Sequence, residues 1–228
     1  MKSFFITTSF ATVIFLSPVM ADRIADHEKR FRESALVFGE IMQAADKGIP
    51  RDLLDRANCV AIVPGLKRAG FIVGAKYGKG VLTCRSQGSW SALSTIRIEG
   101  GSVGFQIGAG ETDLILLVMN ERGKTKLLED KFTVGGDASV MAGSVGRSAQ
   151  ASTDAQLHAE ILAYSRARGL FGGVSLEGAT LRPDTDDNRD IYGPAARQSE
   201  IVNGKFPAAA AARPLIDELM KDPPVEKK

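Results

Sequence analysis

Glycine and β-branched residues dominate the middle of this sequence. Sixteen of the chain's 24 glycines lie between Cys59 and Gly146, among valines, isoleucines and threonines. This composition predicts short strands separated by turns rather than helices. The expected strands are Cys59 to Val63, Gly70 to Ala75, Val81 to Ser86, Trp90 to Ile98, Val103 to Ile107 and Asp113 to Met119.

The short connections between these strands favour antiparallel pairing, because no long helix separates one strand from the next. Glycines such as Gly74 and Gly104 allow a sheet to bend tightly. The run from Leu114 to Met119 is apolar at every position, which predicts a central strand buried on both faces. We therefore expect a strongly curved antiparallel sheet, or a small barrel.

A second glycine-rich stretch, residues 161 to 181, predicts a strand, a turn and another strand. Leu170 and Phe171 follow closely on Arg166 and Arg168, so bulky apolar side chains lie beside cations in the sequence. That combination suits contact with an anionic lipid surface. The alternative is a bend in the core with arginine stems packed over it.

Helical periodicity appears at both ends of the chain. Apolar residues recur at helical spacing from Asp22 to Lys47 and predict an amphipathic helix, which either covers the sheet or lies on a membrane. Pro50 predicts the start of a second helix that runs to about Ala57. Further helices are expected over Lys124 to Asp130, Ile191 to Asn203 and Ala208 to Met220, and 184–188 is expected to be an acidic loop. The sequence thus predicts one α+β domain over residues 22 to 221, flanked by helices.

Residues 1 to 21 have the pattern of a signal peptide: Lys2, an apolar stretch, and small residues up to Ala21. We expect an exported, periplasmic or secreted product that starts at Asp22, and a disordered tail over residues 222 to 228. An oxidising compartment predicts a disulfide between Cys59 and Cys84, the only two cysteines, with two separate buried thiols as the alternative.

The motifs of the common enzyme classes are absent from the sequence. The glycine pair Gly65 and Gly70 is not followed by the Lys-Ser/Thr of a phosphate-binding loop, and there is no Gly-x-Ser-x-Gly elbow. Two cysteines and the distant His27 and His158 have no zinc-ligand spacing. The formal net charge of +2 argues against a general nucleic-acid binder. We expect no catalytic site, no metal and no cofactor.

Several cations remain, most of them next to glycines and large apolar residues. They are Lys67, Arg68, Lys76, Lys79, Arg147, Arg166 and Arg168. We expect them on loops, where they would bind anionic head groups while neighbouring apolar side chains enter the membrane interface. Solvated loop charge without a ligand is the alternative.

Four stretches, residues 62–82 (IVPGLKRAGFIVGAKYGKGVL), 100–123, 135–147 and 165–181, resemble the lipid-binding SYLF domain, which is also known as an actin-binding domain of yeast proteins. The likeness runs from about Ser34 to Gly193 and implies a bacterial exported member with a binding function rather than an enzymatic one. It also implies that basic residues and an amphipathic N-terminal segment recognise phosphoinositides. The residues that carry this hypothesis are the seven cations above together with Leu170 and Phe171.

These observations predict a module that associates peripherally with anionic phospholipid or phosphoinositide membranes. The alternative is an envelope structural or protein-interaction module without lipid specificity. Salt distinguishes the two, because binding through cations weakens with ionic strength whereas an apolar protein interface does not.

Overall fold

The computed structural model describes residues 18–44, 48–70, 73–103, 108–134, 137, 140–143, 159–167, 170–172 and 179–221. Its strands are β1 (Cys59–Gly70), β2 (Val73–Ser86), β3 (Ser89–Trp90), β4 (Ser94–Val103), β5 (Gly108–Val118), β6 (Phe132–Thr133), β7 (Val140–Ala142), β8 (Ile161–Ala167), β9 (Leu170–Gly172) and β10 (Ala179–Pro183). Its helices are α1 (Pro18–Gln43), α2 (Arg51–Arg56), α3 (Glu121–Leu127), α6 (Thr185–Tyr192), α7 (Gln198–Val202), the 3-10 turn η1 (Ala210–Ala212) and α8 (Arg213–Met220).

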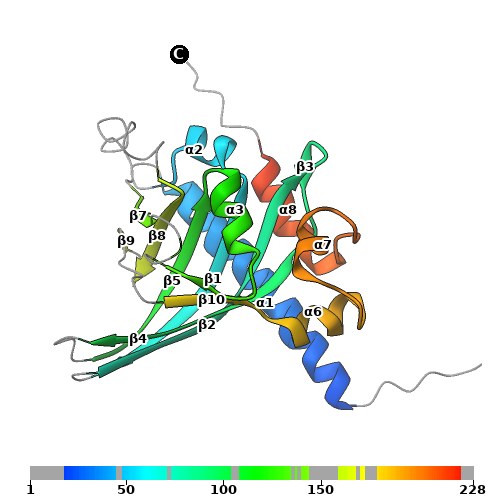
Figure 1. Ribbon diagram of the computed structural model, residues 1–228, viewed down its shortest axis with the longest axis horizontal. Helices are drawn as coiled ribbons and strands as arrows, with labels where there is room; N and C mark the ends of the chain where they lie inside the picture. Colours follow the sequence, from blue (N-terminus) through cyan, green and yellow to red (C-terminus); the bar gives the residue numbers. More distant parts are fainter. Residues whose placement is uncertain are drawn as a thin grey trace, which may run out of the picture.

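The strands form one strongly curled sheet in the order β6-β10-β4-β2-β1-β5-β8-β7 (Figure 1). Neighbouring strands are antiparallel except β7 and β8, which are parallel. The α+β class and the curved, mainly antiparallel sheet are therefore confirmed. The sheet is an open half-barrel rather than a closed barrel.

The strands continue through glycines at which they were expected to end. Residues 73–75 of the predicted strand Gly70 to Ala75 and the whole predicted strand Val81 to Ser86 belong to the single strand β2, which has 14 residues, whereas Gly70 ends β1. The turn that was expected between them is absent. The glycines there, Gly78 and Gly80, pack closely against β1 instead of forming a turn. A Cβ atom on Gly80 would lie 2.2 Å from the carbonyl oxygen of Ile62, so β1 packs directly onto the bare backbone.

The alternation of side chains along β5 places apolar residues on both faces of the sheet, as expected for this strand. Leu114, Leu116 and Val118 belong to the core inside the curl, with β4, β10 and α3. Ile115 and Leu117 belong to the second core, between the sheet and the helices α1, α2 and α8. The central position of β5 is confirmed by its pairing with β1 and β8.

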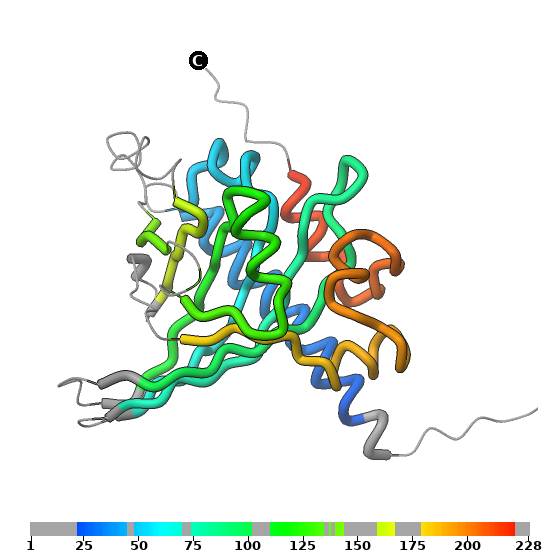
Figure 2. The backbone as a smooth tube through the Cα atoms, viewed as in Figure 1, coloured from blue at the N-terminus to red at the C-terminus, as the bar shows by residue number. Residues whose placement is uncertain are grey.

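Helix α1 lies along the convex side of the sheet, next to α8 (Figure 2). Phe31, Phe38 and Ile41 are at most 1% exposed in the core beneath it. Of the two expected roles for this helix, the structure shows packing on the sheet. None of the described helices is both long and apolar enough to cross a bilayer.

Two predicted boundaries near the C-terminus were wrong. The expected acidic loop at 184–188 instead forms the start of α6, where Asp186 and Asp187 lie in the first turn and complement the helix dipole. The expected helix from Ile191 to Asn203 is interrupted after Tyr192, because Gly193 has a φ of +98° and Pro194 follows it. Most of the predicted signal peptide and the predicted tail 222–228 lie outside the described residues.

The predicted disulfide is present. Cys59 and Cys84 lie directly opposite each other on β1 and β2, and both are fully buried. The bond joins two central strands at the start of β1, which follows α2 closely in the chain.

Candidate anion-binding site on the projecting strands

The ends of β1, β2, β4 and β5 project beyond the helices, toward the lower left of Figure 1. We call this part the arm and define it as residues 66–70, 73–79, 99–103 and 108–112. Its strands are held in register up to the pairs Gly70 with Gly74 and Gly70 with Gly108. The arm carries four of the predicted lipid-binding residues.

Two cations lie side by side across the middle of the arm. Arg68 on β1 is directly opposite Lys76 on β2, and residues in register on neighbouring strands share one face of the sheet. The outer neighbours of this pair are glycines, Gly100 beside Lys76 and Gly110 beside Arg68. A row of glycine, lysine, arginine and glycine thus crosses four strands on the inner face of the curl.

The row has positive charge, and none of the described carboxylates compensates it. Burial lowers the pKa of Arg68, and burial together with the charge of Arg68 lowers the pKa of Lys76. The Nε and Nη2 atoms of Arg68 are buried and have no hydrogen-bond partner among the described residues. Neither cation forms an ion pair with any residue that the structure describes. A bound anion would satisfy these donors and favour the charged forms of both side chains.

One of the flanking glycines, Gly110, leaves room for such a ligand. No described atom lies within 4 Å of the position that a Cβ atom on Gly110 would occupy. The space beside Arg68 on the β5 side of the row is therefore free of other described atoms.

Lys67 lies on the opposite face from Arg68, because successive residues of a strand alternate. It is in register with Tyr77 and Glu111, and Tyr77 is in register with Glu99. Tyr77 is 47% exposed. This outer face borders a groove of about 260 Å³ between α1 and the arm, lined by Asp26, Lys29, Arg30, Glu33, Pro64, Gly65, Lys67, Tyr77, Gly78 and Lys79.

Lys79 lies in β2 rather than on a loop and already binds two carboxylates. Its Nζ atom is 2.7 Å from Asp184 and 3.0 Å from Asp187. Although burial opposes the charged form, these carboxylates raise the pKa of Lys79. Its charge is therefore neutralised within the protein, unlike that of Lys76 three residues before it.

Arg166 is also occupied. Its guanidinium donates hydrogen bonds to Asp113 at 2.9 and 2.6 Å and forms an ion pair with Glu40 of α1. Asp113 in turn accepts a hydrogen bond from the backbone N–H of Gly65, at the irregular point of β1. Arg166 thus joins α1, β5 and β8, and its geometry is that of a structural residue.

The structure describes only some of the remaining predicted residues. The expected strand-turn-strand over 161–181 agrees with β8 and β9, which pair through Arg166 with Phe171 and Ala167 with Leu170. Arg147 and Arg168 lie outside the described residues. The cations expected on loops at 67, 68, 76, 79 and 166 all lie in strands, which corrects that expectation.

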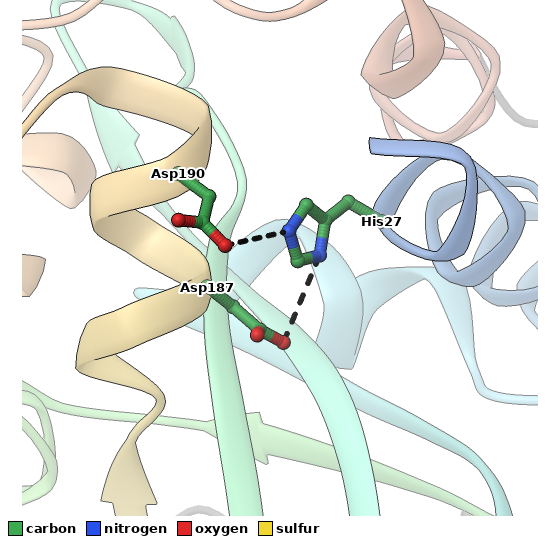
Figure 3. Close-up of side chains that lie close together, drawn as sticks. All are labelled: His27, Asp187 and Asp190. Atoms are coloured by element: carbon green, nitrogen blue, oxygen red, sulfur yellow. Dashed lines mark ion pairs between the residues drawn. The ribbon is translucent and has the colours of Figure 1, made fainter. Parts of the chain in front are cut away.

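A charged cluster that was not predicted from the sequence joins α1 to α6 (Figure 3). The His27 ring lies between Asp187 and Asp190, and its nitrogen atoms are 3.7 and 3.5 Å from the nearest carboxylate oxygens. These residues are about 160 positions apart in the chain, so no local pattern indicates their contact. The i,i+3 spacing of the two aspartates would have been informative only if residues 184–188 had been predicted as a helix.

Comparison with known proteins places the chain in one group of relatives. Residues 99–222 match the sequence model of a family described as "Ysc84: Las17-binding protein actin regulator". The chain is 37% identical over 184 residues to Protein YSC84 of Saccharomyces cerevisiae, a match that covers 79% of this chain and 38% of that protein. It is 38% identical over 184 residues to LAS seventeen-binding protein 3 of the same yeast, covering 78% and 39%.

A human relative shows the same extent of similarity. The chain is 35% identical over 176 residues to SH3 domain-containing YSC84-like protein 1 of Homo sapiens, covering 76% of this chain and 51% of that protein. The chain therefore spans about half, or less, of the length of these relatives.

Proposed function

The chain belongs to the Ysc84 family, whose domain is also called SYLF, and from this premise we propose that it is a non-enzymatic module that binds anionic phospholipid membranes peripherally through the arm. Arg68 and Lys76 would contact the phosphate groups, and the adjacent glycines would admit them. Enzymatic activity forms no part of the proposal.

The observation that carries this proposal is that Arg68 and Lys76 have no ionic partner in the part of the chain that the structure describes. Comparable half-buried cations in this protein, Lys79 and Arg166, each contact two carboxylates. Two adjacent cations without a counter-charge destabilise the free protein and are stabilised by an anion. Phospholipid head groups supply anions at high density, and each nearby cation contributes about 1 kcal/mol of attraction to an anionic surface.

The sequence at the end of the arm supports contact with a bilayer. The two residues that join β1 to β2 are Phe71 and Ile72, and the segment that joins β4 to β5 contains Phe105 and Ile107. These residues lie outside the described part of the chain, and only their sequence enters the proposal. Apolar side chains beside cations are typical of peripheral membrane anchors.

We also propose that residues 1 to 21 direct export and that the protein works in the periplasm or outside the cell. The Cys59–Cys84 disulfide supports this proposal, because disulfides persist in oxidising compartments and are rare in the cytosol. Bacterial phospholipids or foreign membranes would then be the available lipid.

Co-sedimentation with vesicles tests the function. We expect the purified chain to bind vesicles that contain phosphatidylglycerol and to leave neutral phosphatidylcholine vesicles free. The double variant Arg68→Gln, Lys76→Gln should lower the affinity about 10- to 30-fold, the loss expected for two interfacial cations. A matched double variant, Arg122→Gln, Lys205→Gln, removes two exposed cations elsewhere and should bind like the original chain. Equal binding by both double variants would contradict the assignment to the arm.

A protein-interaction module is the second candidate, and the family description supports it because the family is described as Las17-binding. The outer face of the arm, with the exposed Tyr77 beside the groove under α1, is the surface that favours it. Under this candidate, Tyr77→Ala would abolish partner binding while the Arg68→Gln, Lys76→Gln variant would retain it. Binding would also persist at high salt, unlike binding to anionic vesicles.

A further inference from the structure

Residues 22–30 of α1 are attached to the rest of the protein almost entirely by polar contacts. Among residues 22–30, His27 alone is buried and Arg30 is half-buried, whereas the others are exposed. Ile24, the one large apolar residue there, is 39% exposed. The apolar core beneath the helix begins only at Phe31. The position of this segment therefore depends on what His27 and its neighbours contact.

The His27 ring occupies a bridging position between two carboxylates of one helix (Figure 3). Nδ1 is 3.7 Å from Oδ2 of Asp187, and Nε2 is 3.5 Å from Oδ2 of Asp190. The residue is 4% exposed, and neither ring nitrogen has a hydrogen-bond partner. The nearest oxygens thus face both edges of the ring from just beyond hydrogen-bond distance.

The charged groups around the ring come from three elements. Arg23 and Arg30 of α1 pair with Asp190 and Asp187 at 2.7 Å, and Lys79 of β2 pairs with Asp187 at 3.0 Å and with Asp184 at 2.7 Å. Burial opposes ionisation of Asp187, but hydrogen bonds from Lys79 and Arg30 hold its pKa below the usual range. Asp187 is therefore a carboxylate at neutral pH.

These pairs favour a proton over a metal ion as the group that the cluster takes up. The carboxylate oxygens nearest the ring already form ion pairs with Arg23, Arg30 and Lys79, so they have little remaining capacity to act as metal ligands. A metal also binds through one ring nitrogen, whereas here each nitrogen faces a different aspartate.

We propose that His27 is a proton-dependent clasp that fastens residues 22–30 of α1 to α6. A neutral ring has one N–H, so one of the two aspartates faces a nitrogen lone pair. A protonated ring directs an N–H at each aspartate and closes both contacts as charge-assisted hydrogen bonds. Only the protonated ring can therefore close both contacts at once.

The consequence is a pH-dependent exposure of the N-terminal segment. At mildly acidic pH, residues 22–30 are held against α6. At alkaline pH only the arginine pairs hold them, and this half of the amphipathic helix separates more readily from the body. The inference is independent of lipid binding by the arm, because none of its residues belongs to the Arg68 and Lys76 row.

Hydrogen exchange read by mass spectrometry tests the clasp. We expect protection factors in a peptide covering residues 23–33, corrected for the intrinsic pH dependence of exchange, to be about three- to tenfold higher at pH 5.5 than at pH 8. His27→Gln, which stays neutral, should abolish this pH difference, and Asp190→Asn should reduce it. Glu28→Gln changes an exposed charge on the same turn and should retain the full difference.

Two outcomes would overturn the proposal. One is an unchanged pH difference in His27→Gln, which would assign the effect to other groups. The other is equal protection of the original chain at both pH values, which would show that protonation does not fasten the helix. A peptide from the disulfide-linked strands serves as the internal reference for global stability in every sample.

Discussion

Arg68 and Lys76 face each other across β1 and β2 on the same side of the sheet, and neither has an ionic partner among the described residues. This arrangement differs from that of Lys79 and Arg166, whose charges are neutralised by carboxylates. The contrast separates cations that maintain the fold from cations that are available to a ligand.

Substitution of Arg166 should therefore affect stability rather than membrane binding. Arg166→Gln leaves Asp113 and Glu40 without their shared partner, and we expect a loss of about 1 to 3 kcal/mol in the free energy of unfolding. Urea denaturation measures this loss. Binding to anionic vesicles, measured where the variant is folded, should stay within twofold of the original. A large loss of binding with unchanged stability would show that Arg166 belongs to the ligand site.

Gly80, which follows the arm in β2, and Gly110, which lies within the arm, should differ sharply in their tolerance of a methyl group. At Gly80 a Cβ atom would overlap the Ile62 backbone, so Gly80→Ala should destabilise the fold by about 1 to 3 kcal/mol through overpacking. Gly110→Ala is the matched control, because no described atom lies within 4 Å of its Cβ position. Thermal unfolding of the two variants compares them. Equal melting temperatures would contradict the close packing of β1 on β2.

The disulfide should stabilise the fold without being reducible in the native state. Its cysteines are 25 residues apart, and a loop of that size corresponds to about 3 to 4 kcal/mol in the chain-entropy treatment. The double variant Cys59→Ala, Cys84→Ala should lose a comparable amount in urea denaturation. Because both sulfurs are buried, dithiothreitol should react with the original chain only under unfolding conditions. Rapid reduction of the folded protein would contradict this burial.

Asp187 should contribute to stability in a pH-dependent way. Its pKa in the folded state lies below the usual range, so its contribution is present above the unfolded pKa, about 3.9, and is lost as the pH falls through the folded value. Asp187→Asn should lower the melting temperature at pH 7 and weaken the further decrease between about pH 4 and 2. Asp186→Asn, at the exposed neighbouring position, should have a much smaller effect on both, because it removes only an interaction with the helix dipole. Identical acid profiles for the original chain and Asp187→Asn would contradict the cluster.

The sequence predicted those features that depend on local composition. Glycine among β-branched residues indicated a curved antiparallel sheet, and the apolar run from Leu114 indicated its central strand. The length of β2 was not predictable, because Gly78 and Gly80 are accommodated by contacts with β1 rather than by a turn. Local sequence shows glycine, but it does not show which strand lies beside it.

The candidate site was predictable in part for the same reason. The sequence singled out Lys67, Arg68, Lys76 and Lys79, but it did not show that Lys67 faces away from Arg68. That separation follows from strand alternation, which applies only once residues 66–70 are known to be extended. The pairing of Lys79 with Asp187, and of His27 with both aspartates, joins distant segments and required the structure.

The most direct test of the anion site is amine labelling of Lys76 in the presence of vesicles. Acetic anhydride at low concentration reacts with neutral amines, and the lowered pKa of Lys76 predicts faster acetylation than at the exposed Lys205. We predict that vesicles containing phosphatidylglycerol protect Lys76 from acetylation, that phosphatidylcholine vesicles do not, and that Lys205 reacts equally in both. Full reactivity of Lys76 while the protein is bound to anionic vesicles would contradict the account.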